Sequence, residues 1–205
     1  MEQRITEKTR ELFFRYGLKG VTMDDIASSL GVSKKTIYQY YSDKDSLVDA
    51  VVQAEIDRGE MDCKYFFANS ENAIHEIFMA MDGMQEMLSS MNPFVLHDMQ
   101  KYHPRAFKKF DEHKNQFMHK VIMQNIERGK DEELYRTEIN ADIMAKLRLG
   151  SIFLAFNTDL FPPTKYSVLQ VSMEIMNNFI YGICTPKGLK QLLKYTTQSK
   201  NTNKI

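Results

Sequence analysis

The chain has 205 residues, with 27 Lys and Arg against 27 Asp and Glu, so its formal net charge is zero. A chain of this length can form one large domain or a small domain joined to a larger one. The balanced charge excludes a nonspecific polycation, because the summed field of the chain does not attract phosphate. Any binding to nucleic acid would therefore depend on a local basic patch.

The cysteines and the apolar segments indicate the compartment. Cys63 and Cys184 lie far apart and show no metal-ligand spacing, which favours free thiols in a reducing environment. The sequence contains no run of about 18 apolar residues and no apolar N-terminal signal segment. We therefore expect a soluble, cytoplasmic protein that makes no contact with a membrane.

Apolar residues recur at helical spacing along nearly the whole chain, whereas alternating strand patterns are scarce. The pattern predicts an all-α fold. A first helix should end at Gly17, because glycine is favoured where a helix ends. Its apolar stripe consists of Ile5, Thr9, Leu12, Phe13 and Tyr16.

Two capping patterns mark the next helix starts. Thr22-Met-Asp-Asp25 and Ser42-Asp-Lys-Asp45 each place a carboxylate three residues after a hydroxyl, and the two groups together satisfy free amides at a helix start. Short helices are predicted for residues 24–30 and 34–40. A long helix is predicted from Ser42 to a break at residues 69–70.

Further helices are predicted in the second half of the chain, for residues 71–90, 93–102, 104–128, 140–158 and 165–183. A last helix is predicted to begin at Pro186, since proline suits the first helical turn. Pro162 and Pro163 indicate a loop within residues 158–165. The polar tail after residue 195 is expected to be disordered.

The two short helices have the spacing of a helix-turn-helix. Gly31-Val-Ser33 separates them, which matches the turn of DNA-binding units of this kind. Ala27 lets the helices approach closely, Gly31 accommodates the turn, and Ile37 anchors the second helix from its buried side. This spacing predicts binding to duplex DNA.

The outward face of the second short helix supplies the predicted DNA contacts. Residues 33–41 contain two lysines and no acid, which gives a local charge of +2. The predicted base-reading residues are Lys34, Lys35, Tyr38 and Gln39, and the predicted phosphate-binding residues are Thr22, Thr36, Tyr38, Tyr40 and Lys44. Taken singly, the lysines also fit a solvated surface and Tyr38 or Tyr41 also fits the core. Of these residues, Tyr41 is the one that we expect to be buried.

The stretch from Gly20 to Leu47 resembles the signature of the TetR family of bacterial transcriptional regulators almost position by position. Its core reads Thr36-Ile-Tyr-Gln-Tyr-Tyr-Ser-Asp-Lys44. Tyr41 stands where the family usually has phenylalanine, and it adds a hydroxyl that needs a partner. Thr185-Pro-Lys-Gly-Leu189 is also similar to the family. Beyond these segments the resemblance concerns architecture, since the C-terminal domains of such regulators diverge widely.

A dimer is expected, because one short recognition helix contacts too few base pairs and such proteins bind paired half-sites as two-fold dimers. The two late helices carry more apolar residues than a narrow stripe needs, and the resemblance favours a four-helix dimer interface there. The predicted interface residues are Ile152, Phe156, Val171, Ile175 and Phe179. The alternative is that these residues are buried core.

The middle of the chain, residues 78–123, is rich in Met and Phe, which adapt to apolar ligands of varied shape. In an inducer-binding regulator this composition suits a lipophilic effector. The predicted pocket residues are Met84, Met87, Met91, Phe117 and Met118. The alternative is a core that uses methionine.

The spacing of the polar residues does not indicate a metal site or a catalytic site. The candidate ligands His97, Asp98, His103, His113 and His119 show no paired-ligand pattern and fit a solvated polar face. The sequence has no phosphate loop, no G-x-S-x-G motif and no nucleophile beside an evident base. We expect no enzyme activity, no metal and no cofactor.

Together these patterns predict a helix-turn-helix DNA-binding domain in residues 1–46, a helical effector-binding and dimerisation domain in residues 47–195, and a disordered tail in residues 196–205. We expect a ligand-responsive homodimeric regulator, a repressor that a small apolar or amphipathic effector releases from a palindromic operator in double-stranded DNA. The alternative is an architectural or assembly protein that binds the chromosome without an effector.

Overall fold

The computed structural model describes residues 1–202, and for residue 86 and residues 198–202 it describes the backbone alone. Within residues 1–202 the chain forms helices and no β-sheet, so the predicted all-α fold is confirmed. The helices are α1 (Glu2–Tyr16), α2 (Met23–Leu30), α3 (Lys34–Tyr38), α4 (Lys44–Asn69), α5 (Ala73–Ser89), α6 (Val95–Tyr102), α7 (Pro104–His113), α8 (His119–Asp131), α9 (Ala141–Leu154), α10 (Val168–Ile183) and α11 (Pro186–Thr202). None of these helices is long and apolar enough to cross a bilayer.

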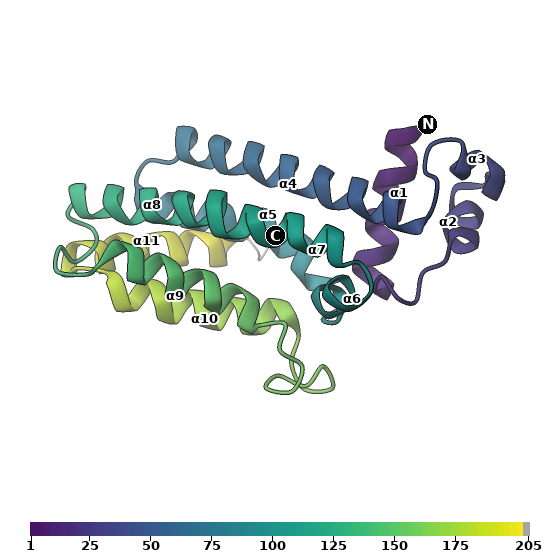
Figure 1. The fold of residues 1–205 in the computed structure, drawn as a ribbon. Coiled ribbons are helices and arrows are strands. Elements are labelled where there is room, and N and C mark those ends of the chain that lie inside the picture. Colours follow the sequence, from purple (N-terminus) through teal and green to yellow (C-terminus); the bar gives the residue numbers. More distant parts are fainter. Residues whose placement is uncertain (203–205) are drawn as a thin grey trace.

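The N-terminal helices form one end of an elongated molecule (Figure 1). α1, α2, α3 and the first turns of α4 share a buried cluster, and α6 and α7 pack against the same cluster. Its members include Ile5, Phe13, Ile26, Ile37, Leu47, Met99 and Ala106. α1 ends as predicted, because Gly17 adopts a φ of 80° and its N–H donates to the Phe13 carbonyl at 2.9 Å.

The start of α4 lies one residue later than the capping pattern predicted. The N-cap is Asp43 and not Ser42, and the Asp43 carboxylate accepts the Ser46 N–H at 2.7 Å. The Ser46 hydroxyl in turn accepts the Asp43 N–H at 3.2 Å. The two possible caps overlap in sequence, and the observed register leaves Asp45 outside the cap while Leu47 is buried.

α4 leaves the N-terminal unit and runs along the helical domain, where the remaining helices pack (Figure 1). The buried side chains of this domain form separate clusters. One joins the start of α5 to α10 and α11 around Ile74, Ile180 and Leu192. Another joins the end of α5 to the start of α10 around Leu88 and Val171. A third joins α8 to α9 around Ile126 and Ala145, and both ends of α5 are well packed.

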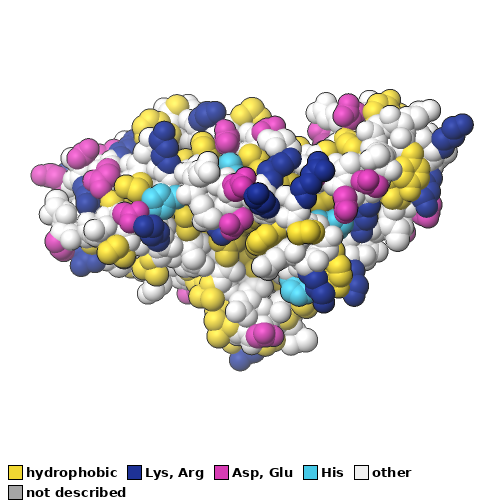
Figure 2. Space-filling view, viewed as in Figure 1, with side chains coloured by type: hydrophobic (Ala, Val, Ile, Leu, Met, Phe, Trp, Pro, Cys, Tyr) yellow, Lys and Arg dark blue, Asp and Glu magenta, His cyan; other side chains and the backbone are white. Residues whose placement is uncertain are grey.

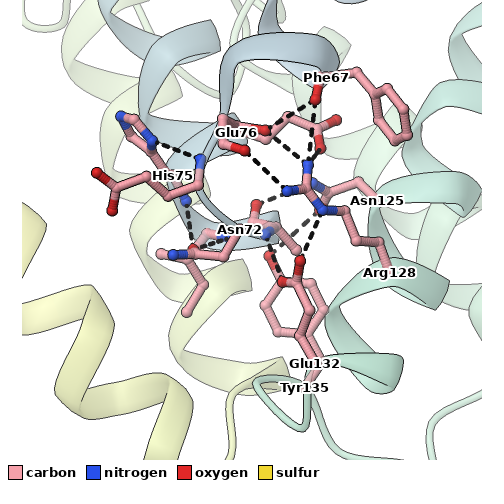
Figure 3. A network of polar contacts seen from close by, with 12 residues as sticks. Phe67, Asn72, His75, Glu76, Asn125, Arg128, Glu132 and Tyr135 are labelled. Atoms are coloured by element: carbon pink, nitrogen blue, oxygen red, sulfur yellow. Dashed lines mark hydrogen bonds and ion pairs between the residues drawn. The ribbon is translucent and has the colours of Figure 1, made fainter.

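A polar network fastens α8 to α5 (Figure 3). The Arg128 guanidinium donates to the Glu76 carboxylate at 3.0 Å and to the Glu132 carboxylate at 2.8 Å. Burial raises the pKa of Glu76, although Asn125 and Arg128 act in the opposite direction. Glycine is required one residue later, at Gly129, because an added Cβ would lie 2.0 Å from the ring of Tyr135.

Two elements differ from their predictions. The helix predicted for residues 104–128 is interrupted by a π-helical turn, Lys114–Met118, which had no sequence signal. α11 continues to Thr202, whereas the sequence predicted disorder from residue 196. The rest of that predicted tail, residues 203–205, lies outside the described residues.

Candidate nucleic-acid interface

α2 and α3 form the predicted helix-turn-helix. The capping box at the start of α2 is present as predicted, and the Asp25 N–H donates to the Thr22 hydroxyl at 3.2 Å. Gly31 has a φ of 67° in the turn, a conformation that glycine adopts without strain. The Val32 N–H then donates to the Ala27 carbonyl at 3.1 Å. These bonds fix the direction in which α3 leaves the turn.

α3 presents a short outward face. Its N-cap Ser33 accepts the Thr36 N–H at 3.1 Å, and the helix ends at Tyr38, before the predicted residue 40. Ile37 is fully buried. With this side chain inside, the neighbouring side chains of α3 face away from α2.

Three of the four predicted base readers are available on the surface. Lys35, Tyr38 and Gln39 are exposed, and among the described residues their side chains form no hydrogen bond or ion pair. Lys34 is also exposed, but its ammonium pairs with the Asp24 carboxylate at 2.9 Å. Basic side chains with acidic neighbours accordingly project from this end of the molecule (Figure 2). α2 therefore balances part of the local positive charge.

The predicted phosphate-binding hydroxyls differ in availability. Tyr40 is exposed, and its hydroxyl has no hydrogen-bond partner among the described side chains. The Thr22 hydroxyl donates to the Asp25 carboxylate at 2.7 Å, and the Thr36 hydroxyl lies 2.9 Å from that of Ser33. Both threonines are thus engaged at helix caps, and Tyr40 is the most accessible of these hydroxyls.

Lys44 is directed into its own domain. Its ammonium donates to the Leu18 carbonyl and lies 5.7 Å from the centroid of the Phe13 ring. Burial lowers the pKa of Lys44. As the first residue of α4, Lys44 lies beside the end of α1, where a backbone carbonyl lacks a helical partner. This position does not fit the free phosphate clamp that the sequence predicted.

Tyr41 is buried as predicted, with 6% of its surface exposed. Its hydroxyl lies 2.6 Å from the hydroxyl of Thr6 on α1. Burial raises the pKa of Tyr41, so the hydroxyl stays protonated. The departure from the family's phenylalanine is therefore matched by a hydrogen-bond partner on the neighbouring helix.

Charged side chains join the helix-turn-helix unit to the helical domain. His103, at the end of α6, lies 2.6 Å from the carboxylate of Asp45 on α4. Arg105, on α7, lies 2.6 Å from the carboxylate of Asp49, one turn further along α4. A movement of α6 or α7 therefore acts directly on the first turns of α4. Sequence patterns gave no indication of these contacts, because each pair lies more than 50 residues apart.

The histidines do not form one solvated face. His103 and Asp98 are buried, whereas His97 is exposed. Asp98 accepts the backbone N–H of Lys19 at 3.0 Å, which explains its burial. Among the described side chains, no group of three His, Cys, Asp or Glu is arranged to hold a metal ion.

The predicted dimer residues belong mainly to the interior of the protomer. Val171 is 5% exposed, and Phe156 and Ile175 pack against its cluster. Phe179 packs against two buried clusters, and Ile152 is partly buried. These side chains contact neighbouring helices of the same chain, which fits the core alternative, and their part in an interface stays a prediction.

Other apolar residues of α9 and α10 are exposed. Ile143 is 58% exposed and Leu147 is 55% exposed, and Leu154 continues their row along α9. Tyr181 is exposed on α10. Gly150 and Gly182 lie on these exposed faces, and a Cβ added to either would meet no atom within 4 Å. The two helices therefore present an apolar surface with small residues in it.

The predicted effector residues do not line the hollow that the structure describes. Met87 and Met91 pack against the cluster around Leu88, whereas Met84 is exposed. Phe117 and Met118 are half-buried in the π-helical turn. The described hollow has a volume of about 390 Å³ and is lined by Phe67, Gln124, Arg128, Asp131 and Glu132.

One residue that sequence reasoning missed is Arg148 on α9. It is half-buried, and burial lowers its pKa to about 10. A sequence signal was present, because no Asp or Glu stands three or four residues from Arg148. Lys146 on the same helix, by contrast, pairs with Asp142 four residues earlier.

Comparisons with known proteins agree with this arrangement. Residues 5–51 match the sequence profile described as bacterial regulatory proteins, tetR family. The HTH-type transcriptional regulator YvaF of Bacillus subtilis is 28% identical over 187 residues, covering 89% of this chain and 95% of the relative. An HTH-type transcriptional regulator of Staphylococcus aureus strain USA300 is 36% identical over 55 residues, which are 27% of this chain and 30% of that protein.

Solved structures share the fold of the whole chain. A TetR-family regulator from Agrobacterium tumefaciens has a TM-score of 0.75 at 13% identity, covering 90% of this chain and 97% of that one. A transcriptional regulator from Saccharomonospora viridis in complex with choline has a TM-score of 0.69 at 17% identity, with coverages of 90% and 97%.

The helix-turn-helix and the helical domain behind it define a DNA-binding regulator of transcription. Residues 5–51 form a DNA-binding domain of the TetR family of bacterial transcriptional regulators, and the whole chain shares the fold of TetR-family structures. Regulators of this family bind DNA and are generally dimers, and they are not enzymes.

Proposed function

We propose that this protein is a homodimeric repressor that a small apolar or amphipathic effector releases from a palindromic operator. The observation that carries the proposal is the mechanical continuity between the two domains. α4 belongs to both domains. Its first turns are in contact with His103 at the end of α6 and with Arg105 on α7. Rearrangement of the helical domain would therefore change the placement of α3.

The surface of α3 supports sequence-specific contact with DNA. Gln39 and Lys35 are exposed and unpaired among the described residues, and their amide and ammonium groups suit adenine and guanine edges in the major groove. Tyr38 adds an exposed ring beside them, and Tyr40 adds a hydroxyl for a phosphate. This face is too small for useful affinity alone, which favours two copies on paired half-sites.

The exposed faces of α9 and α10 support a two-fold dimer. Ile143, Leu147 and Tyr181 would remain in contact with water in a single protomer. Glycine in a helix interior costs about 1 kcal/mol relative to alanine, and its presence at Gly150 and Gly182 fits close approach by helices of a second copy. The dimer surface that we propose therefore lies on the predicted helices, α9 and α10, but consists of other residues than the predicted ones.

An effector is supported by the loosely packed Met and Phe residues of the helical domain. Met81 and Met87 on α5 and Phe117 and Met118 in the π-helical turn are half-buried rather than buried. Such side chains can rearrange around an apolar ligand. The structural neighbour from Saccharomonospora viridis was solved in complex with choline, which supports a small-molecule ligand for a protein of this fold.

A genomic DNA-binding map followed by operator release tests the proposal. We expect the full-length protein to enrich a small set of palindromic sites, and purified protein to retain such a site with strong salt dependence. A ligand that raises the melting temperature of the protein should release the DNA. Site-specific binding that no ligand alters would favour the architectural alternative, and binding without sequence preference would contradict the proposal.

A further inference from the structure

The helical domain is well packed at its two ends and less so between them. The clusters around Ile74 and Leu88 lie at opposite ends of α5. Between these ends, from Ile77 to Met87, none of the described side chains is buried. The other helices of the protomer therefore cover the middle turns of α5 incompletely, and a ligand could pack against them without displacing a buried side chain.

Soft apolar side chains lie on the middle turns of α5 and in the π-helical turn. Met81 and Met87 on α5 are half-buried, and so are Phe117 and Met118 in the π-helical turn. π-helical turns occur mostly as short bulges in longer helices, and frequently at functional sites. This turn is joined to α9 through Lys114, whose ammonium lies 5.3 Å from the centroid of the Phe153 ring.

Arg148 on α9 lies over Phe179 of α10, and Phe179 packs against the same buried cluster as Ile77 and Phe78 of α5. Arg148 lies next to Leu149 and one turn after Ala145, both of which are buried, and so on the inner side of the helix. Its guanidinium carbon lies 5.8 Å from the centroid of the Phe179 ring. The exposed row of Ile143 and Leu147 lies on another side of α9.

The guanidinium of Arg148 has no acidic partner among the described residues. Its one side-chain hydrogen bond there is to the Ser151 hydroxyl at 3.5 Å, the outer limit for such a bond. Arg128 in the same domain, by contrast, is paired with two carboxylates, those of Glu76 at 3.0 Å and Glu132 at 2.8 Å (Figure 3). A half-buried cation with five donors and no anion is unfavourable, and an anionic ligand would satisfy it.

We propose that the effector is an amphipathic organic anion whose carboxylate or phosphate head pairs with Arg148 while its apolar body lies among the Met and Phe side chains of α5 and the π-helical turn. This inference rests on the proposed effector-responsive function and names the chemical class of the effector. The planar guanidinium fork matches both kinds of anionic head through paired hydrogen bonds. A quaternary ammonium ligand such as choline would be repelled.

The test compares ligands that share a tail and differ in their heads. Full-length protein is titrated with dodecanoate, dodecyl phosphate, dodecanol and dodecyltrimethylammonium below their micelle concentrations, with affinity and melting temperature as readouts. We expect at least one anion to bind about tenfold or more tightly than dodecanol and to raise the melting temperature. The two anions distinguish a carboxylate from a phosphate site.

Variants assign the preference to one side chain. Arg148→Met should bind dodecanol as the wild type does, lose the preference for the anion, and melt no lower than the wild type without ligand. Lys146→Met, which removes an exposed cation of the same helix, should keep the preference. Arg148→Lys should keep part of it, because lysine retains the charge but not the fork.

Three outcomes would overturn the inference. They are equal binding of dodecanol and both anions, an anion preference that survives in Arg148→Met, and failure of both anions to bind or raise the melting temperature. Operator binding is measured separately on the same preparations. If the anion preference is absent but a ligand still releases the operator, the proposed effector class is wrong and the proposed repressor function remains supported.

Discussion

Side chains of the N-terminal unit divide into those that fix its shape and those that remain available for DNA. Tyr41 and Lys44 both bond to α1 or to the turn after it, and both are partly or wholly buried. Lys35 and Gln39 stand nearby in sequence without a partner among the described residues. Two lysines in one motif thus have different tasks, and sequence alone does not separate them because the direction of a side chain depends on the helix beside it.

Substitution of the two lysines separates these tasks. Lys35→Ala should weaken binding to the preferred duplex and relax the base preference at one position of each half-site, with an unchanged melting temperature. Lys44→Ala should lower the melting temperature by about 2–4 °C, since it removes a hydrogen bond worth about 1 kcal/mol. Anisotropy with labelled DNA and calorimetry measure the two effects. Identical effects of both changes would contradict the assignment.

Elements were predictable where local chemistry decides them. The glycine at the end of α1 and the capping box of α2 lie where the sequence placed them, because each depends on residues within one helical turn. The start of α4 was misplaced by one residue, since two overlapping caps compete there. The π-helical turn has no local signature, and it was missed. Packing against neighbouring helices decides such features.

The N-cap of α4 can be tested by comparing two adjacent substitutions. Asp43→Ala should lower the melting temperature, whereas Ser42→Ala should leave it nearly unchanged. Hydrogen bonds from the Ser46 N–H and hydroxyl hold the pKa of Asp43 below its usual value. The contribution of its carboxylate is therefore present above the unfolded pKa of about 4 and is lost as the pH falls towards the lower folded pKa.

Calorimetry at several pH values checks this expectation. The difference in melting temperature between wild type and Asp43→Ala should be largest near neutral pH and should narrow below about pH 4. A difference that is independent of pH, or a larger effect of Ser42→Ala, would show that Asp43 is not the cap.

At the scale of the whole molecule, helical periodicity revealed the fold but not the partner of each apolar face. Val171 and Leu147 are both apolar and both lie on helices predicted for the interface, yet one is buried in the protomer and the other is 55% exposed. The difference depends on where the other helices lie, which a single sequence does not specify. For the same reason the sequence did not show that Arg148 lacks an acidic partner, because this depends on which helices surround its side chain.

One introduced charge tests the proposed dimer surface. Leu147→Glu should convert the protein from dimer to monomer at micromolar concentration, because a carboxylate buried between two copies has no partner. Leu160→Glu provides a matched control, since Leu160 is also 55% exposed but lies outside α9 and α10. Sedimentation measures both. A dimeric Leu147→Glu protein, or a monomeric control, would place the interface elsewhere.

Selection of DNA from a random duplex library tests the central claim most directly, namely that α3 reads sequence as one of two symmetric heads. Wild-type protein should enrich a two-fold symmetric motif, and Gln39→Ala should change the preferred base at one matching position in each half-site. An asymmetric or absent motif, or the same motif for both proteins, would contradict the account.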